Sequence, residues 1–224
     1  MVPRSAFATI TIVKTLKIDS SDQPLELAQE AADVIREGGV VCLPCAGRYR
    51  LFADLLINDA VTRLLQAKSR IKTAPALVFI AGASDLDQVA EEVPDLARNI
   101  ANELWPRPIT IRVKPSSELP RKVLKDLGGK KLKLGLRTPP AGLVQHVIEA
   151  VGSPLLVSSA NRQKKSGESS AAQVTKTFGP YIDLFINSGD LQPEEASTII
   201  SIKNDAVQIE RLGAVDAATI ERCC

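Results

Sequence analysis

Hydroxyl and amide side chains directly follow a short apolar run in the segment 154–161 (PLLVSSAN). The run Leu155–Val157 is typical of a buried strand, and a basic stretch, 162–165, follows the polar residues. In an open α/β sheet, ligands bind just beyond the carboxyl ends of the strands. The hydroxyls and the amide could hold phosphate oxygens there, and the neighbouring lysines would add positive charge. Alternatively, the segment is an ordinary surface turn, because Ser and Asn are common turn residues.

A second chemical feature is the cation pair Lys68 and Arg70, at the end of an apolar helical pattern. Two cations after a helix could clamp an anionic ligand, the arginine through its bidentate fork. Alternatively, they stabilise the helix itself, since Lys and Arg favour helix C-termini. This pair and the polar strand end become informative only when taken together. The sequence contains neither a Walker-type loop nor GxGxxG, and its single histidine, His146, completes no convincing Ser/His/Asp triad.

The four cysteines do not form a convincing metal or redox motif. Cys42 and Cys45 have the CxxC spacing of a redox site or half of a zinc site. There is no second pair at zinc spacing, and Cys42 lies in the apolar run 40–43, as a core cysteine would. We therefore expect no metal site, and the sequence assigns no role to Cys42, Cys45, Cys223 or Cys224.

The composition predicts a globular protein with an aliphatic core, since 45% of the 224 residues are hydrophobic and only 4% are aromatic. The net charge of +2 does not by itself imply a nucleic-acid partner. The basic residues are nevertheless concentrated in the stretches 121–137 and 162–165. No signal peptide is visible, and no apolar run reaches transmembrane length. We therefore expect a cytoplasmic protein with reduced thiols and no membrane partner.

Alternating strands and helices must position these residues. Apolar and β-branched runs predict strands at 8–17, 40–44, 76–80, 108–113, 131–137, 155–157, 181–187, 197–202 and 207–211. Apolar stripes at helical spacing predict helices at 25–36, 58–68, 84–89, 94–104, 141–151 and 171–178. This alternation predicts an α/β fold with one twisted, mixed sheet and flanking helices. No linker-like break divides the chain, so we expect a single domain over residues 1–224.

Several segments, taken in order, resemble the YrdC/YciO family, whose best-known members are L-threonylcarbamoyladenylate synthases. The resemblance extends over about 25–214, nearly the whole chain. The segments that carry it are 38–44 (GGVVCLP), 68–70 (KSR), 104–110 (LWPRPIT), 134–137 (LGLR), 154–161 (PLLVSSAN), 197–200 (STII) and 211–214 (RLGA).

The resemblance implies an activity, substrates and partners. The family's enzymes make threonylcarbamoyl-AMP from L-threonine, bicarbonate and ATP, with release of pyrophosphate. The product feeds the formation of N6-threonylcarbamoyladenosine in tRNA. ATP is thus implied as a substrate, with Mg2+ assisting at its phosphates, and tRNA or double-stranded RNA as a partner. The implied fold is a twisted α/β sheet with a basic concave face, which Lys130, Lys131, Lys133, Arg162, Lys164 and Lys165 would line.

The resemblance also assigns residues to two halves of one site, although it identifies no catalytic residue. The residues that match nucleotide-binding positions of the family are Lys68, Arg70, Ser159, Asn161, Ser170 and Arg211. Ser170 is the weaker match, because 162–165 reads as a short insertion. Arg137 and Ser197 match positions that hold the amino acid.

The family signature Pro-Thr-Asp-Thr-x-Tyr-Gly is largely lost in this chain. It reads PCAGRYR over residues 44–50, so only Pro44 and Tyr49 are retained. Gly47 stands where the second threonine helps to hold the substrate, and Arg50 stands where the signature closes with glycine.

Three further departures lie elsewhere in the matched segments. Ala74 replaces an asparagine of the nucleotide site, Phe79 replaces a substrate-side histidine, and Val157 replaces the first serine of Ser-Thr-Ser-Ala-Asn. We expect Gly47, Phe79 and Val157 to line one apolar sub-pocket beside the amino-acid-binding residues, with Arg50 at its mouth. The loss of three hydrogen-bonding partners would weaken recognition of threonine's polar groups.

Three hypotheses follow for the function. The first is a threonylcarbamoyl-AMP synthase, or a variant that activates another amino-acid substrate with ATP by positioning and charge stabilisation. The second is a paralogue that binds nucleotide or double-stranded RNA without turnover. The third, a purely structural partner protein, leaves the retention of the nucleotide-site residues unexplained.

Overall fold

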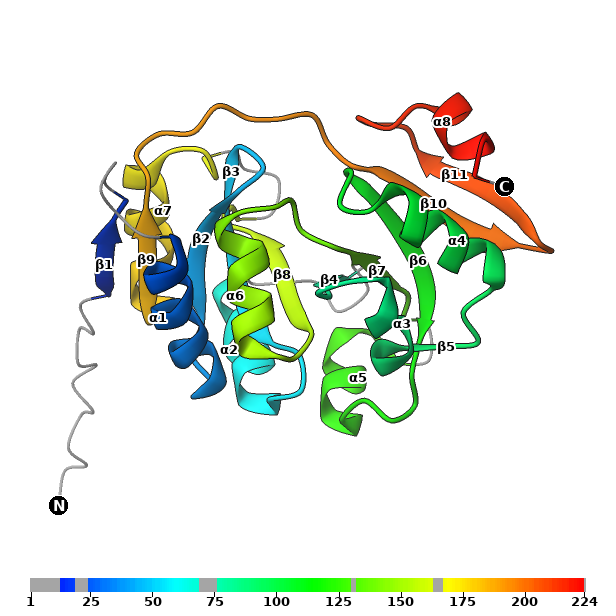
Figure 1. Cartoon of the computed structure of the whole chain (residues 1–224). Helices are drawn as coiled ribbons and strands as arrows, with labels where there is room; N and C mark the ends of the chain where they lie inside the picture. Colours follow the sequence, from blue (N-terminus) through cyan, green and yellow to red (C-terminus); the bar gives the residue numbers. More distant parts are fainter. Residues whose placement is uncertain (1–12, 19–23, 69–75, 130–131, 163–166, 224) are drawn as a thin grey trace, which may run out of the picture.

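One large, twisted, mixed sheet organises the molecule (Figure 1). The computed structural model describes residues 13–18, 24–68, 76–129, 132–162 and 167–223. Its strands are β1 (Lys14–Lys17), β2 (Val41–Cys45), β3 (Arg48–Asp54), β4 (Ala76–Phe79), β5 (Ala90–Glu91), β6 (Ile109–Pro115), β7 (Leu134–Arg137), β8 (Leu155–Ser159), β9 (Leu184–Asn187), β10 (Thr198–Lys203) and β11 (Ala206–Arg211). Their order across the sheet is β1-β9-β2-β3-β8-β4-β7-β6-β10-β11, and β5 pairs with β6.

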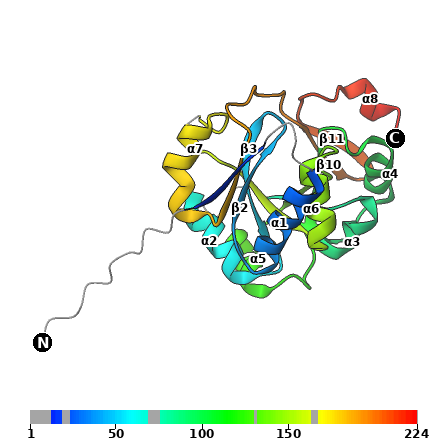
Figure 2. The same ribbon diagram turned by 60° about the vertical axis from the view of Figure 1, so that its left-hand side comes forward.

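Helices cover both faces of this sheet. They are α1 (Pro24–Arg36), α2 (Asn58–Lys68), α3 (Leu86–Val89), α4 (Asp95–Leu104), α5 (Arg121–Leu127), α6 (Leu143–Val151), α7 (Ala171–Phe178) and α8 (Ala217–Glu221), with short 3-10 turns η1 (Ala83–Asp85) and η3 (Gly179–Tyr181). The helices α1 and α6 lie side by side on one face (Figure 2). In the part of the chain that the structure describes, no helix is long and apolar enough to cross a membrane.

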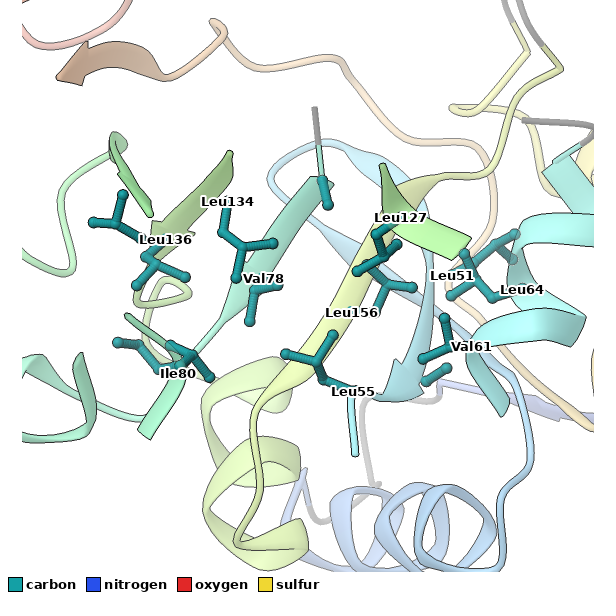
Figure 3. Packing of buried hydrophobic residues seen from close by; sticks show 14 of the residues in the cluster. Leu51, Leu55, Val61, Leu64, Val78, Ile80, Leu127, Leu134, Leu136 and Leu156 are labelled. Atoms are coloured by element: carbon teal, nitrogen blue, oxygen red, sulfur yellow. The ribbon is translucent and has the colours of Figure 1, made fainter. Parts of the chain in front are cut away.

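The main core lies on the opposite face, between the sheet and the helices α2 and α5 (Figure 3). Leu156 of β8 and Val78 of β4 are fully buried there against Leu64 of α2 and Leu127 of α5. Burying an aliphatic side chain of this size stabilises a fold by roughly 1.5–3 kcal/mol. A second apolar cluster packs α1 and α6 against the other face. The aliphatic side chains thus form two apolar layers, one on each face of the sheet, and helices cover both.

The altered signature segment forms a tight β-hairpin that the sequence patterns did not predict. Strands β2 and β3 pair antiparallel, with Cys45 opposite Arg48. The two residues between them, Ala46 and Gly47, have φ angles of +51° and +66°. Positive φ at both turn residues is the property of type I′ turns, whose twist matches that of paired strands. The retained Tyr49 thereby lies inside a strand, with its side chain buried.

A long connection joins the two ends of the sheet. Strands β9 and β10 follow one another in the chain but lie far apart in the strand order. The segment between them, residues 188–197, which we call the crossing segment, arches over the carboxyl end of β2 and the turn of the β2–β3 hairpin (Figure 1). It brings the residues before β10 over the β2–β3 hairpin.

Most elements agree with those predicted, and four strands and helices were not foreseen. The predicted helices at 58–68 and 171–178 have the observed bounds. The strands β3 and β5 and the helices α5 and α8 were missed. The predicted strand at 8–17 is observed as β1 within the described residues, and its first part lies outside them. The predicted α/β class with one twisted, mixed sheet and flanking helices is confirmed.

Candidate functional site

A cavity of about 330 Å³ lies between the sheet and the crossing segment. It brings together four of the residues assigned from the sequence: Arg137, Ser159, Ser197 and Arg211. Arginine dominates its polar lining, which includes Arg48, Arg50, Arg112, Arg137 and Arg211. Three glutamates, Glu168, Glu194 and Glu195, also line it. The lining is therefore predominantly cationic and suited to anions, and the carboxylates balance part of its charge.

Arg137 is the buried cation of this cavity. It ends β7, and its side chain lies over the Phe79 ring, with 6.0 Å between the guanidinium carbon and the ring centroid. The residue is only 5% exposed, and its buried Nε has no hydrogen-bond partner among the described residues. Burial lowers the pKa of Arg137 below its usual value. A desolvated guanidinium with an open donor is suited to a carboxylate or phosphate ligand.

Ser197 is held in place from two sides. The Nε and Nη2 atoms of Arg211 donate to the backbone oxygen of Ser197 at 3.1 and 2.6 Å. The Oγ of Ser197 lies 3.1 Å from the Oγ1 of Thr110 and accepts from Arg211 at 3.2 Å. Two nitrogens of the Arg211 guanidinium thus hold the end of the crossing segment in place. Burial lowers its pKa, as do the charges of Arg112 and Arg50.

The polar end of β8 is organised around Lys68. The ammonium group of Lys68 donates to the backbone oxygen of Ser159 at 2.6 Å, to Oδ1 of Asn161 at 2.9 Å and to the Asn161 backbone oxygen. Lys68 is 8% exposed and lies 5.8 Å from the centroid of the Phe178 ring. The Oγ of Ser159 donates to Oδ1 of Asn161 at 2.8 Å. The structure therefore joins these three predicted residues, with Lys68 beneath the turn.

The remaining nucleotide-site predictions are placed differently. Asn161 lines a neighbouring cavity of about 340 Å³ beyond β8, together with Arg162 and Lys176. Ser170 precedes α7, its side chain does not cap the helix, and it is absent from the lining of both cavities. The predicted residues Arg70, Ala74, Lys130, Lys131, Lys164 and Lys165 lie outside the described residues.

The structure corrects the expected apolar sub-pocket. Phe79 and Val157 are 0% and 2% exposed and belong to the core cluster beneath α1 and α6. The Phe79 ring packs 6.1 Å from that of Phe52 instead of lining the cavity. These two apolar side chains join the core because helices cover the face of the sheet on which they lie. Arg50, by contrast, lines the cavity as expected.

Gly47 is enclosed by the crossing segment. A Cβ atom at this position would lie 2.0 Å from the backbone oxygen of Gln192 and 2.6 Å from the backbone nitrogen of Glu194. No side chain fits there, and the positive φ of Gly47 disfavours one as well. Arg48 fastens the same contact, since its Nη1 donates to the Glu194 backbone oxygen at 2.9 Å and its Nε lies 3.6 Å from Glu168. The cavity roof is therefore tied to the hairpin.

Sequence reasoning did not identify Thr110, Arg112 and Glu194 as site residues. Thr110 and Arg112 alternate with buried isoleucines in β6, and a period of two marks residues that share one face of a strand. That signal was available in the sequence. The position of Glu194 follows from the path of the crossing segment, for which the sequence holds no periodic signal.

Comparison with known proteins identifies the family. The model of the Sua5/YciO/YrdC family, described as telomere recombination, matches residues 33–213. A threonylcarbamoyl-AMP synthase of Pyrococcus abyssi is 30% identical over 86% of this chain and 55% of its own length. One from Bacillus subtilis is 29% identical over 90% and 57%, and one from Pseudomonas aeruginosa is 31% identical over 71% and 83%. The chain thus spans little more than half the length of the first two relatives.

Solved structures agree with this assignment. The structure of P. abyssi Sua5 with L-threonine superimposes with a TM-score of 0.79 and 28% identity, over 95% of this chain and 61% of that one. Escherichia coli YciO superimposes with a TM-score of 0.78 and 22% identity, over 93% and 99%, and shares the fold. The match of the family model to most of the chain, together with these relatives, shows that this protein belongs to the Sua5/YciO/YrdC family.

Proposed function

We propose that this protein is a threonylcarbamoyl-AMP synthase-like enzyme that joins ATP, bicarbonate and an amino acid, and that its product serves the N6-threonylcarbamoyladenosine modification of tRNA. The proposal is carried by one arginine-lined cavity that holds Arg137 and Ser197 of the predicted amino-acid half-site together with Ser159 and Arg211 of the predicted nucleotide half-site. Arg137 and Ser197 represent the amino-acid side, and Ser159, backed by Lys68 and Asn161, represents the nucleotide side. The names of the relatives support the same reaction.

The proposed chemistry has two steps. The amine nitrogen of the amino acid bonds to the carbon of bicarbonate with loss of water, which gives a carbamate. A carbamate oxygen then bonds to the α-phosphorus of ATP, the bond from that phosphorus to the bridging oxygen breaks, and pyrophosphate leaves. Both steps need several anions to be held close together, so a cavity that is rich in arginine lowers the barrier by positioning and by charge stabilisation.

Each half of the cavity has a role in this proposal. Arg137 binds the amino-acid carboxylate, since its buried Nε is an open donor. Ser159 and Asn161 contact the nucleotide, and Lys68 holds these two residues in position. Mg2+ enters with ATP as part of the substrate, because no cluster of three or more His, Cys, Asp or Glu side chains poised for a metal occurs in the described part of the chain.

A second candidate function is nucleotide binding without turnover. The enclosure of Gly47 by the backbone at Gln192 favours it, because the crossing segment occupies space next to the altered signature. A site that binds ATP and forms no adenylate would show this role.

Measurement of pyrophosphate release from ATP and bicarbonate, across a panel of amino acids, tests the proposal. We expect release to require both bicarbonate and an amino acid, and to fall at least about 10-fold in Arg137→Met, which loses a charge-assisted hydrogen bond. The exposed Arg121→Met is the matched control and should retain full activity. ATP binding by calorimetry without release for any amino acid would favour the binding module, and absence of ATP binding would refute both candidates.

A further inference from the structure

Arg50 is a second cation of the cavity with an open donor. It lies in β3 opposite Ser159 of β8 and lines the cavity floor. Its buried Nε has no hydrogen-bond partner among the described residues. The Arg50 guanidinium also interacts with the buried thiol of Cys45, so Nε is the atom of this side chain that lacks a partner. Arg50 and Arg137 line the same cavity, each with an unpartnered Nε.

The other arginines of the cavity already have partners. Arg112 pairs with Glu210 at 2.5 Å, and Arg48 lies 3.6 Å from Glu168. Arg211 is held by Ser197, as described above. The charge of Glu194 acts on Arg137, but these two residues form no ion pair within 4.0 Å in the described structure. Arg50 and Arg137 thus remain as two cations of one cavity, each without an ion-pair partner among the described residues.

The two guanidinium groups in this partly desolvated cavity repel one another, and this repulsion contributes to the lowered pKa of Arg137. One carboxylate can neutralise one of them through a bidentate pair. The side-chain hydroxyl of threonine could accept a hydrogen bond from the other, but threonine has no second negative charge to neutralise it. At the same time, Gly47 presents no hydroxyl where the family signature has threonine, and the enclosing backbone leaves no room for one. Gly47 thus offers the substrate no hydroxyl, and Arg50 adds a cation to the cavity lining.

From this juxtaposition of Arg50 with Arg137, and building on the proposed function, we propose that the amino-acid substrate of this protein carries a second carboxylate. The substrate class is a dicarboxylic amino acid of the aspartate or glutamate type. Its α-carboxylate pairs with Arg137, and its side-chain carboxylate pairs with Arg50. The bonds that form and break are those of the proposed reaction, so only the side chain of the substrate differs.

Pyrophosphate release compared between matched amino acids tests this substrate class. L-aspartate and L-glutamate differ from L-asparagine and L-glutamine in charge and hardly in size. We expect kcat/KM for one acidic amino acid to exceed that for its amide and for L-threonine by about 10- to 100-fold, as a charge-assisted hydrogen bond provides. Arg50→Met should abolish this preference and leave the KM for ATP within about two-fold. The exposed Arg121→Met should behave as wild type.

Three outcomes would overturn the inference. A wild-type preference for L-threonine would leave the proposed function standing and remove the acidic substrate. A large rise in the KM for ATP in Arg50→Met would assign Arg50 to the phosphates instead. If no amino acid supports release, titration of L-aspartate and L-glutamate into the protein saturated with a non-hydrolysable ATP analogue still decides the matter, because binding of neither would refute it. Thermal unfolding of each variant confirms that it is folded.

Discussion

Tyr49 fastens the crossing segment to the sheet, so removal of its hydroxyl should destabilise the protein measurably. The hydroxyl donates to the backbone oxygen of Gly189 at 2.6 Å and accepts from the backbone nitrogen of Ser188 at 3.0 Å. Burial raises the pKa of Tyr49, so the hydroxyl keeps its proton and remains a donor. The ring itself packs edge-on against Phe185, with 5.0 Å between centroids. Tyr49→Phe retains this packing and deletes these two hydrogen bonds, together with the longer contact of the hydroxyl with Oδ1 of Asn187 at 3.3 Å.

The expected loss follows from those two bonds. Each contributes about 1 kcal/mol net, and the partly buried backbone groups left behind lose their partners, so we expect about 2 kcal/mol in total. For a protein of this size, that loss lowers the Tm by roughly 4–8 °C. Thermal unfolding followed by circular dichroism, together with urea unfolding, measures it.

The chain offers a matched control for this variant. Its only other tyrosine, Tyr181, is 38% exposed, so Tyr181→Phe should leave the free energy of unfolding within about 0.5 kcal/mol of wild type. If Tyr49→Phe were as stable as Tyr181→Phe, the hydroxyl would not anchor the crossing segment and the reasoning would be refuted.

Two further variants test other parts of the fold. Lys68→Met keeps the apolar stem but removes the donor to Ser159 and Asn161, so it should lower the free energy of unfolding by about 2–3 kcal/mol. Lys68→Arg should recover part of this lost stability. An unchanged urea midpoint in Lys68→Met would contradict the expectation. Lys114 helps to lower the pKa of Glu91 from 4.5 to about 2. The ionised Glu91 therefore stabilises the folded state above about pH 4.5, and this contribution is lost as the pH falls toward 2. Glu91→Gln should therefore flatten the dependence of Tm on pH in that window, and an unaltered slope would show that the pair contributes nothing.

Local periodicity accounts for the elements that the sequence predicted well. The apolar stripe of 58–68 matches α2 because the same residues that repeat at helical spacing, Val61 and Leu64 among them, are buried in the structure. The strand β3 was missed although Tyr49 and Leu51 alternate with arginines, a period of two that the altered signature obscured. The helix α5 was missed because its few apolar residues stand among lysines, and only packing against α2 shows their role.

The candidate site could be predicted from the sequence only in part. The resemblance placed Arg137, Ser159, Ser197 and Arg211, and these four residues line one cavity. It could not show that Phe79 is buried in the core, since this depends on which part of the sheet the helices α1 and α6 cover. The pairing of Thr110 with Ser197 was equally inaccessible, because these residues meet through the register of β6 against β10, and a single sequence does not contain that register.

The path of the crossing segment has a consequence for how the protein folds. Hairpin β2–β3 and strand β8, which carry Arg50 and Ser159, lie near the middle of the strand order, whereas β10, which follows Ser197, and β11, which carries Arg211, form one end of it. The contacts that close the cavity therefore join residues far apart in sequence, and such contacts form late because loop-closure entropy opposes them. A partly folded chain in which β10 has not yet paired with β6 would have no ligand site, so acquisition of ligand binding should be the last event in refolding, after the secondary structure has formed.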